Sequence, residues 1–342
     1  MAEKPSILGA GLPQLLLLGV LWGATFPVAR VAVAAGADPF LLVVLDLLLA
    51  AAVLAPVAAA SRSPRPVALE LARSAGLGAL LIAGINVPLY WGLQHATGGS
   101  ASIVYATSPI LSLLALYAAG SPVVLHRRQL LALTLGLGGV VLLGLQTSGA
   151  SASTNLAVLA AFALGASCQG AGAVLVGRAR PEGEGHWGLT FQFLGGAGAA
   201  AVTLPFLASS APFPVTLSTV GSVVYVGVVS MAVGYTLFFD LIHRAGAVRA
   251  NQVTFLNPVV ALTVGVVAFG ESWQPLEGVA LACIIGALVL LQTVPGHRGA
   301  TSAPRSDAPR RSPTGSVPAA GVPPSGLPGP GAGQGTYVSH DS

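Results

Sequence analysis

The segment LNPVVALTVGVVAFGESW at residues 256–273 has an earlier counterpart, TSPILSLLALYAAGSP, at residues 107–122. Each segment has a polar residue before a proline and then an apolar run that ends at a glycine: Ser108-Pro109 with Gly120 in one, Asn257-Pro258 with Gly270 in the other. The two prolines are 149 positions apart. This likeness predicts that the chain consists of two copies of one structural unit.

The composition is typical of an integral membrane protein. Of the 342 residues, 54% are hydrophobic and only 8% are charged, whereas soluble domains contain about 25% charged residues. So few charges cannot cover a water-exposed surface, and we expect a lipid bilayer around most of the chain. The net charge of +4 does not indicate a nucleic-acid partner, because the basic residues sit in short connections and form no continuous patch. Cys168 and Cys283 lie inside apolar runs, which favours buried thiols over a disulfide or a metal site.

Ten apolar segments are long enough to cross a membrane, which takes about 20 residues per helix. We expect an all-α membrane protein with helices at residues 12–32, 40–60, 75–95, 100–119, 130–147, 154–177, 188–208, 218–242, 248–269 and 275–293. The runs are continuous and do not alternate, which excludes the strands of a β-barrel. The first segment could also be a cleaved signal peptide, but Trp22, Pro27 and Arg30 interrupt it and favour a retained helix.

The basic residues predict the orientation of these helices. If residues 1–11 are cytoplasmic, the cytoplasmic segments hold 14 of the 15 lysines and arginines, and only Arg30 lies near the outer side. Cytoplasmic connections of membrane proteins are enriched in Lys and Arg. We therefore expect a multi-pass protein of the cell membrane with both termini in the cytoplasm. Residues 294–342 are rich in Pro, Gly and Ser and predict a disordered cytoplasmic tail, for which partner binding is the alternative.

The two units are expected to have opposite orientations in the membrane. Residues 12–147 hold five predicted helices and residues 154–293 hold the other five. After an odd number of crossings, the second unit enters the membrane from the other side. The repeat is supported by GLQHATGG and LIHRAGAV, which precede the fourth helix of each unit. Inverted repeats are typical of secondary transporters, whose solute site lies near the midplane where the repeats meet.

Three stretches resemble the EamA family of the drug/metabolite transporter superfamily: GVLWGATFPVAR at 19–30, GLQHATGGSASIVYATSPIL at 92–111 and LIHRAGAVRANQVTFLNPVVALTVGVVAFGES at 241–272. The resemblance covers about residues 10–293 and implies ten helices in two five-helix units. It also implies export of small organic metabolites or drugs by alternating access, coupled to protons. Two positions depart from the family pattern: Gly120-Ser121 stands where members often have Gly-Glu, and Asp46 stands in a helix where many carry an arginine.

Asp46 is the candidate for proton coupling. It lies in FLLVVLDLLLAAAVL, about 10 Å from the outer end of its helix at 1.5 Å per residue. Polar groups in hydrocarbon are costly and usually face an interior or a cavity. Burial disfavours the charged form of a carboxyl, so this group could bind and release a proton. The alternative is a structural pairing with Arg30 or with backbone groups.

Eight further polar or aromatic residues are candidates for lining a solute site. Asn86, Tyr90 and Gln94 recur every four residues and share one face of the third helix, which should face the interface between the repeats. Hydrogen bonding between helices is the alternative role for each of them. The other five candidates are Trp22, Thr25, Gln169, Gln192 and Tyr235. Asp240 is expected instead to form an ion pair near the membrane surface.

The sequence lacks the motifs of several other classes of protein. It has no P-loop, no HExxH, no GxSxG and no Cys/His cluster, so we expect no enzyme, no cofactor and no metal site. A membrane-embedded enzyme and a non-transporting scaffold are the alternatives. The first would need convergent acid, base or metal ligands, and the second would not need Asp46 or the polar helix face. The expected partners are a small-molecule solute and the bilayer, and a homodimer is an open alternative.

Overall fold

The computed structural model describes residues 12–61, 67–120, 127–144, 152–179, 185–209, 212–270 and 275–292. These residues form helices joined by short connections, and no strand occurs among them, which confirms the all-α prediction. They belong to one structural unit, residues 1–300. Residues 1–11 and the predicted tail at 294–342 lie outside the described part of the chain.

The helices follow the apolar segments of the sequence. The first half contains α2 (Leu12–Ala34), α3 (Pro39–Ala60), α4 (Ala68–Leu77), η1 (Gly78–Ile82), α5 (Ala83–Gly92), α6 (Gly98–Tyr105), α7 (Ser108–Ala118) and α8 (Arg127–Gly144). The second half contains α9 (Ala152–Ala179), α10 (Gly185–Leu207), α11 (Leu217–Val224), η2 (Tyr225–Gly234), α12 (Tyr235–Ala245), α13 (Ala247–Ala250), η3 (Asn251–Phe255), α14 (Leu256–Phe269) and α15 (Pro275–Gln292). In both halves the third helix is continuous and includes a π-helical segment, η1 or η2.

The two matching segments of the sequence have matching structures. Pro109 lies in the first turn of α7, and Pro258 lies in the first turn of α14. Proline lacks a backbone N–H and is accommodated in the first turn of a helix, where that hydrogen bond is not made. Gly120 and Gly270 follow the two helices with φ of 70° and 65°, the left-handed conformation that glycine adopts at helix ends.

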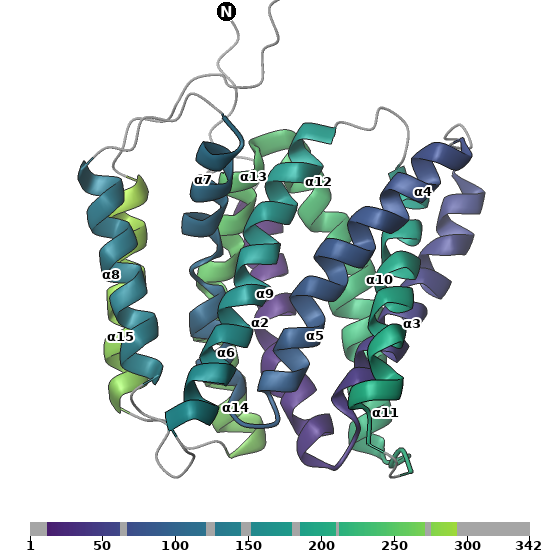
Figure 1. Cartoon of the computed structure of the whole chain (residues 1–342), viewed down its shortest axis with the longest axis horizontal. Coiled ribbons are helices and arrows are strands. Elements are labelled where there is room, and N and C mark those ends of the chain that lie inside the picture. Colours follow the sequence, from purple (N-terminus) through teal and green to yellow (C-terminus); the bar gives the residue numbers. More distant parts are fainter. Residues whose placement is uncertain are drawn as a thin grey trace, which may run out of the picture. The chain divides into compact units, whose positions relative to one another are not determined.

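The halves pack against each other through matched contacts (Figure 1). The first helix of each half packs on a late helix of the other half: α2 packs on α14, and α9 packs on α7. The second helices of the two halves, α3 and α10, pack on each other. Glycines allow the close approach of these helices. A Cβ on Gly23 would lie 3.1 Å from the Asn257 carbonyl oxygen, and a Cβ on Gly170 would lie 2.9 Å from the Ser108 carbonyl oxygen. Gly23 and Gly170 therefore occupy corresponding places in the two halves.

Eight helical stretches among the described residues are long and apolar enough to cross a membrane. They are Pro13–Ala34, Pro39–Ala60, Ala68–Gly92, Gly98–Ala118, Leu156–Arg178, Gly185–Leu207, Leu217–Arg244 and Asn251–Phe269. At the other two predicted positions stand α8 and α15, which have 18 residues each. These two helices pack on each other at one side of the unit, on the left in Figure 1.

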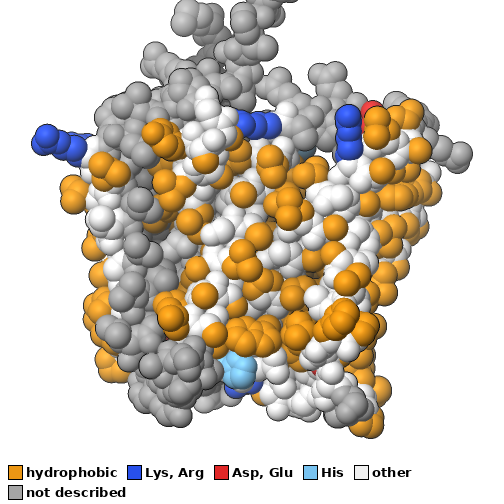
Figure 2. Space-filling view, viewed as in Figure 1, with side chains coloured by type: hydrophobic (Ala, Val, Ile, Leu, Met, Phe, Trp, Pro, Cys, Tyr) orange, Lys and Arg blue, Asp and Glu red, His pale blue; other side chains and the backbone are white. Residues whose placement is uncertain are grey.

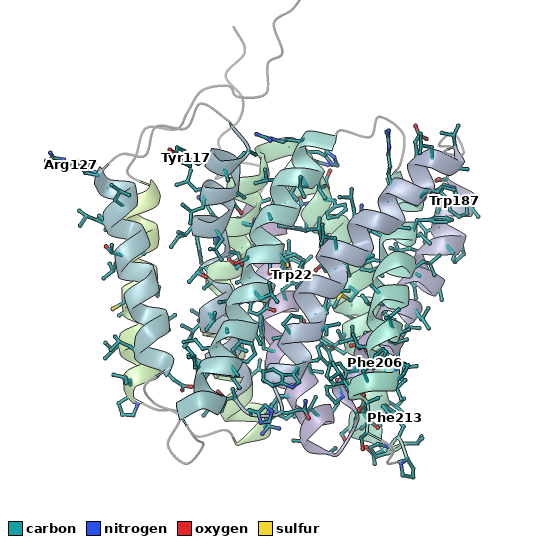
Figure 3. The ribbon with its side chains drawn as sticks, viewed as in Figure 1. Trp22, Tyr117, Arg127, Trp187, Phe206 and Phe213 are labelled. Atoms are coloured by element: carbon teal, nitrogen blue, oxygen red, sulfur yellow. The ribbon has the colours of Figure 1, made fainter. Side chains whose placement is uncertain are left out.

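The surface of the unit carries many exposed apolar side chains. Val267 is 81% exposed and Phe206 is 80% exposed. Hydrophobic side chains cover the face shown in Figure 2, whereas most of its Lys and Arg side chains lie along the upper edge. Arg127 marks this upper end in Figure 3, and Trp22 lies about midway down. We name the upper end the basic end and the lower end the opposite end. An apolar surface with most of its Lys and Arg side chains at one end is the surface expected of a protein in a bilayer.

Candidate solute-binding site

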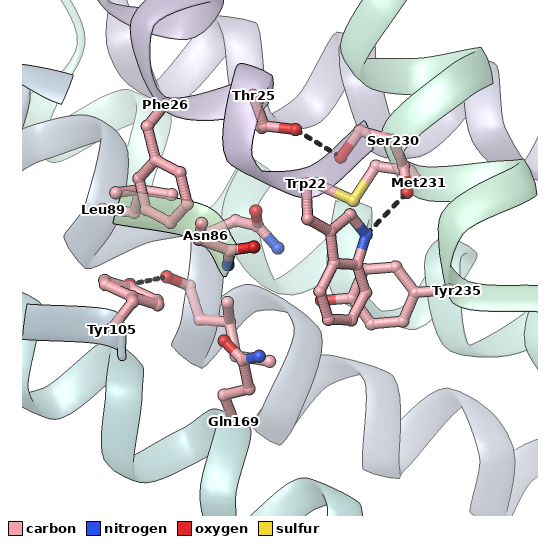
Figure 4. Close-up of a pocket in the computed structure, with 12 residues that line it drawn as sticks. Trp22, Thr25, Phe26, Asn86, Leu89, Tyr105, Gln169, Ser230, Met231 and Tyr235 are labelled. Carbon is pink, nitrogen blue, oxygen red and sulfur yellow. Dashed lines mark hydrogen bonds between the residues drawn. The ribbon is translucent and has the colours of Figure 1, made fainter. Parts of the chain in front are cut away.

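A small cavity lies in the interior of the unit (Figure 4), and we name it the central cavity. Its volume is about 40 Å³, which is room for a few water molecules. Both halves of the chain contribute its walls. The lining residues are Trp22, Thr25, Phe26, Ile85, Asn86, Leu89 and Tyr105 from the first half and Gln169, Ser230, Met231, Tyr235 and Asn257 from the second.

Trp22 forms one wall of the central cavity and is held from several sides. Its indole Nε1 donates a hydrogen bond to the Ser230 carbonyl oxygen at 3.0 Å. Its ring packs against Tyr235 and Phe238, with centroid separations of 5.1 and 4.7 Å. Gly234 makes room for the indole, because a Cβ there would lie 2.5 Å from Nε1. This fixed aromatic wall suits the apolar part of a solute.

The polar groups on the other walls are neutral amides and hydroxyls. Thr25 Oγ1 lies 2.7 Å from Ser230 Oγ, and Asn86 Nδ2 donates to the Ile82 carbonyl oxygen at 2.8 Å. Asn257 is buried, and its Oδ1 has no hydrogen-bond partner among the described residues. A buried acceptor without a partner costs about 1–3 kcal/mol, a cost that a donor on a solute would remove. The cavity can therefore orient a solute by hydrogen bonds without pairing a full charge.

Five of the eight solute-lining candidates surround the central cavity: Trp22, Thr25, Asn86, Gln169 and Tyr235. The three residues of the predicted polar face of the third helix have three different surroundings. Asn86 lines the central cavity, the Tyr90 hydroxyl donates to Asp46, and Gln94 lines a second cavity near one end of the unit. The predicted third helix at 75–95 ends earlier in the structure, because α5 ends at Gly92 and Gln94 lies in the turn that follows. Gln94 therefore does not continue the helix face of Asn86 and Tyr90, and those two residues meet different neighbours at successive turns of α5.

Several lining residues were not among the sequence candidates. Phe26, Tyr105 and Met231 are apolar or aromatic residues inside apolar runs, and such residues resemble ordinary core positions. The position of Asn257 could have been recognised in the sequence, because it is the polar residue before the proline of the repeated segment. A polar residue at the break of a helix inside a membrane usually faces an interior or a cavity, and that reasoning could have identified it.

Asp46 lies on α3, outside the central cavity, and is 1% exposed. Its Oδ2 accepts a hydrogen bond from the Tyr90 hydroxyl, and its Oδ1 has no partner among the described residues. The alternative pairing with Arg30 is not formed, because Arg30 donates from Nε to the Ala96 carbonyl oxygen at 3.1 Å. One carboxyl oxygen of Asp46 is therefore available to a proton or to a further donor.

Asp46 and Gln192 occupy corresponding places in the two halves. A Cβ on Gly78 of η1 would lie 1.8 Å from the Gln192 carbonyl oxygen, and a Cβ on Gly227 of η2 would lie 3.0 Å from the Asp46 carbonyl oxygen. Both side chains are buried. One half has a carboxyl and the other an amide at this place, so only the first half has a group that can exchange a proton here.

Asp240 has a structural role at the end of α12. Arg244 Nε donates to its Oδ1 at 2.8 Å, and Gln14 Nε2 donates to its Oδ2 at 2.9 Å. The predicted ion pair of Asp240 is confirmed. Because Gln14 belongs to α2, this cluster also ties the start of α2 to the end of α12.

Sequence comparisons point to one family. The model of the EamA-like transporter family matches the chain twice, at residues 9–145 and 156–293. Protein PecM of Dickeya dadantii (strain 3937) is 28% identical over 225 residues, which cover 64% of this chain and 72% of that protein. A probable terminal-alkyne amino-acid exporter of Streptantibioticus cattleyicolor is 28% identical over 304 residues, 85% of this chain and 96% of that protein. The uncharacterized inner membrane transporter YedA of Escherichia coli (strain K12) is 25% identical over 282 residues, 81% of this chain and 89% of that protein.

A solved crystal structure shares the fold. It aligns with 82% of this chain and 96% of its own chain, with a TM-score of 0.60 and 21% sequence identity. The two family matches cover both halves of the chain, and two of the three relatives above are named as transporters or exporters. The chain therefore belongs to the EamA-like transporter family and is a multi-pass membrane transporter.

Proposed function

We propose that the chain is a secondary active transporter that exports small organic solutes across the cell membrane by alternating access, in exchange for protons. The observation that carries this proposal is the central cavity. It is built by both halves, has an aromatic wall at Trp22 and contains a buried acceptor, Asn257 Oδ1, without a partner among the described residues. Solute sites of secondary transporters lie between repeats near the midplane, and Trp22 is about midway between the two ends in Figure 3.

Two inverted five-helix units give this proposal its mechanism. The matched helix starts at Pro109 and Pro258 and the matched contacts of Gly23 and Gly170 support a two-fold relation between the units. With α8 and α15 as the fifth and tenth crossings, both termini lie on one side of the membrane. Inverted halves have two equivalent packings, each open to one side. Exchange between these packings exposes the central cavity to each side in turn.

The central cavity is small in the described conformation. Its volume of about 40 Å³ is far below the roughly 300–1,000 Å³ of small-molecule sites, so the cavity must widen, by movement of the halves, before it holds a solute. At the basic end, both Nη groups of Arg178 donate to the Ala119 carbonyl oxygen, at 3.3 and 3.2 Å. A cation at the C-terminus of a helix is favourable. Opening toward this end requires the tie between α9 and α7 to break.

The chemistry of the cavity indicates which part of a solute it holds. Its amides, hydroxyls and aromatic rings suit an uncharged moiety with both apolar and hydrogen-bonding parts. One relative is named a probable terminal-alkyne amino-acid exporter and aligns over 85% of this chain. That name supports export as the direction and the apolar side chain of an amino-acid-like metabolite as the moiety held.

Asn257→Leu tests the central cavity as the solute site. The substitution removes the free acceptor at similar volume, and we expect the half-saturating solute concentration to rise about fivefold, as for a hydrogen bond of about 1 kcal/mol. The measurement is flux into proteoliposomes, with a panel of small metabolites and an imposed pH gradient. Thr263→Val, on the exposed part of the same helix, is the control and should transport normally. Wild-type kinetics for Asn257→Leu would show that the solute binds elsewhere.

Single cysteines test the orientation in a version that lacks Cys168 and Cys283. Ala35 is exposed at the opposite end, and Ala119 is exposed at the basic end. An impermeant maleimide should label Ala35→Cys in intact cells and Ala119→Cys only after permeabilisation, because basic connections face the cytoplasm. Labelling of Ala119→Cys alone in intact cells would reverse the assigned topology.

A further inference from the structure

A second cavity lies at the opposite end of the unit, and the proposed function leaves it without a role. Its volume is about 660 Å³, within the range of small-molecule sites. Its walls come from the end of α2, the start of α3, the end of α5 and the residues that end α10. Arg30 in this cavity is one helical turn from Phe26 of the central cavity. The two cavities therefore lie at neighbouring positions along α2. We name the larger one the end cavity.

Arg30 is the cation of the end cavity. It is half-buried, and its Nε donates to the Ala96 carbonyl oxygen at 3.1 Å. Among the described residues, no carboxylate pairs with it and its two Nη groups donate to no acceptor. A guanidinium held by Nε presents its remaining N–H groups as a fork that matches the two oxygens of a carboxylate. A partly buried cation without an ion-pair partner among the described residues also favours an incoming anion.

The acidic group of the end cavity does not compete for Arg30. Asp38 Oδ1 accepts hydrogen bonds from the backbone N–H groups of Phe40 and Leu41, at 3.0 and 2.9 Å. Its Oδ2 accepts one from the Ser209 backbone N–H at 2.6 Å. The carboxylate is thus engaged in holding the start of α3 and in joining it to the residues after α10. It stabilises the wall of the cavity and forms no ion pair with the guanidinium.

An aromatic surface lies in the same cavity. Trp91 is half-buried and meets the His95 ring edge-on, with a centroid separation of 5.2 Å. Gln94, on the same stretch of chain, donates weakly to the Trp91 carbonyl oxygen at 3.4 Å. A half-buried indole and a guanidinium without an ion pair, both in the wall of one cavity, suit a solute that has both an apolar part and an anionic end.

We propose that the end cavity is a second solute site, which takes a small solute bearing a carboxylate. The carboxylate lies on the Nη groups of Arg30, and the apolar part packs on Trp91. This site differs in chemistry from the central cavity, which offers neutral partners only. A solute that leaves the central cavity along α2 would be held at Arg30 before release.

The test is binding to the purified full chain in nanodiscs of neutral phosphatidylcholine, by calorimetry. The probes are 3-phenylpropionate and its neutral amide, 3-phenylpropionamide, which differ only in the anionic end. We expect the acid to bind at least about tenfold more tightly than the amide, as for a charge-assisted pair. L-phenylalanine, which carries the same carboxylate as a zwitterion, shows whether an added ammonium is tolerated.

Arg30→Gln should weaken binding of 3-phenylpropionate about tenfold, and Arg30→Lys should keep part of it. Arg73→Gln is the matched control, because Arg73 is an exposed arginine of α4 that lines neither cavity, and it should bind the acid normally. Melting temperatures confirm that each variant is folded. Equal binding by Arg30→Gln, or equal affinity for acid and amide, would overturn the proposal.

Trp22→Ala distinguishes binding in the end cavity from binding in the central cavity. It alters the central cavity and leaves the end cavity intact, so it should bind 3-phenylpropionate normally even if it transports poorly. Loss of 3-phenylpropionate binding in this variant would show that the acid binds in the central cavity, and would refute the assignment to Arg30. These experiments measure binding and do not depend on transport. The site at Arg30 can therefore be tested even if the chain proves not to transport solutes.

Discussion

Gly78→Ala should prevent stable folding, whereas Gly76→Ala, two residues earlier, should be tolerated. A Cβ on Gly78 would lie 1.8 Å from the backbone carbonyl oxygen of Gln192, well under the 3.0 Å that real Cβ contacts respect. The obstacle is the backbone of a packed helix, so η1 and α10 would have to separate instead of a side chain turning aside. We expect a loss of at least about 3 kcal/mol in the free energy of unfolding.

Gly76 is the matched control for this prediction. It lies in the same long helix, is exposed, and a Cβ there would meet nothing within 4 Å. Alanine favours a helix over glycine by about 0.5–1 kcal/mol, so Gly76→Ala should keep or raise the melting temperature. The measurement is thermal unfolding in detergent, together with the yield of monodisperse protein. A normal melting temperature for Gly78→Ala would show that η1 and α10 do not approach as closely as described.

The positions of the helices could be predicted from the sequence because a membrane imposes its own length on an apolar segment. The predicted segments 40–60 and 188–208 differ from α3 and α10 by three residues or fewer at each end. The breaks before α7 and α14 were not predicted, because the segments 100–119 and 248–269 were each expected as one α-helix. In the structure α6 ends before α7 begins, and η3 precedes α14. A proline, which restricts the backbone, stands in the first turn after each break. The π-helical segments η1 and η2 were not predicted either, because the composition of GALLI at 78–82 does not differ from that of other apolar stretches.

The candidate site was only partly predictable, for a physical reason. A polar residue inside an apolar run is a signal of burial, and it indicated Asn86 and Gln169, which line the central cavity. The neighbour that each residue meets depends on how its helix packs at that depth. Tyr90 therefore meets Asp46 on α3 although it shares a helix face with Asn86. Phe26 gave no signal, because an aromatic ring in an apolar run can face lipid, core or cavity equally well.

Asp46 is the candidate for proton coupling, and Asp46→Asn should uncouple transport from the pH gradient and leave the fold intact. Asparagine keeps the shape of the side chain and can still accept the hydrogen bond from the Tyr90 hydroxyl that ties α5 to α3. It cannot take up and release a proton. An imposed pH gradient should then no longer accelerate or oppose solute flux in proteoliposomes, while solute exchange at equal pH continues in part.

Two further variants separate coupling from packing. Tyr90→Phe removes the donor to Asp46 and should lower stability by about 1–3 kcal/mol, yet coupling should persist because the carboxyl remains. Adding Arg30→Gln to Asp46→Asn should change the melting temperature only as much as Arg30→Gln does alone, since Arg30 donates to Ala96 and does not touch Asp46. Recovery of stability in that double variant would favour the pairing of Asp46 with Arg30. A stable Asp46→Asn protein whose flux still responds fully to the pH gradient would exclude Asp46 as the coupling group and direct attention to another titratable side chain.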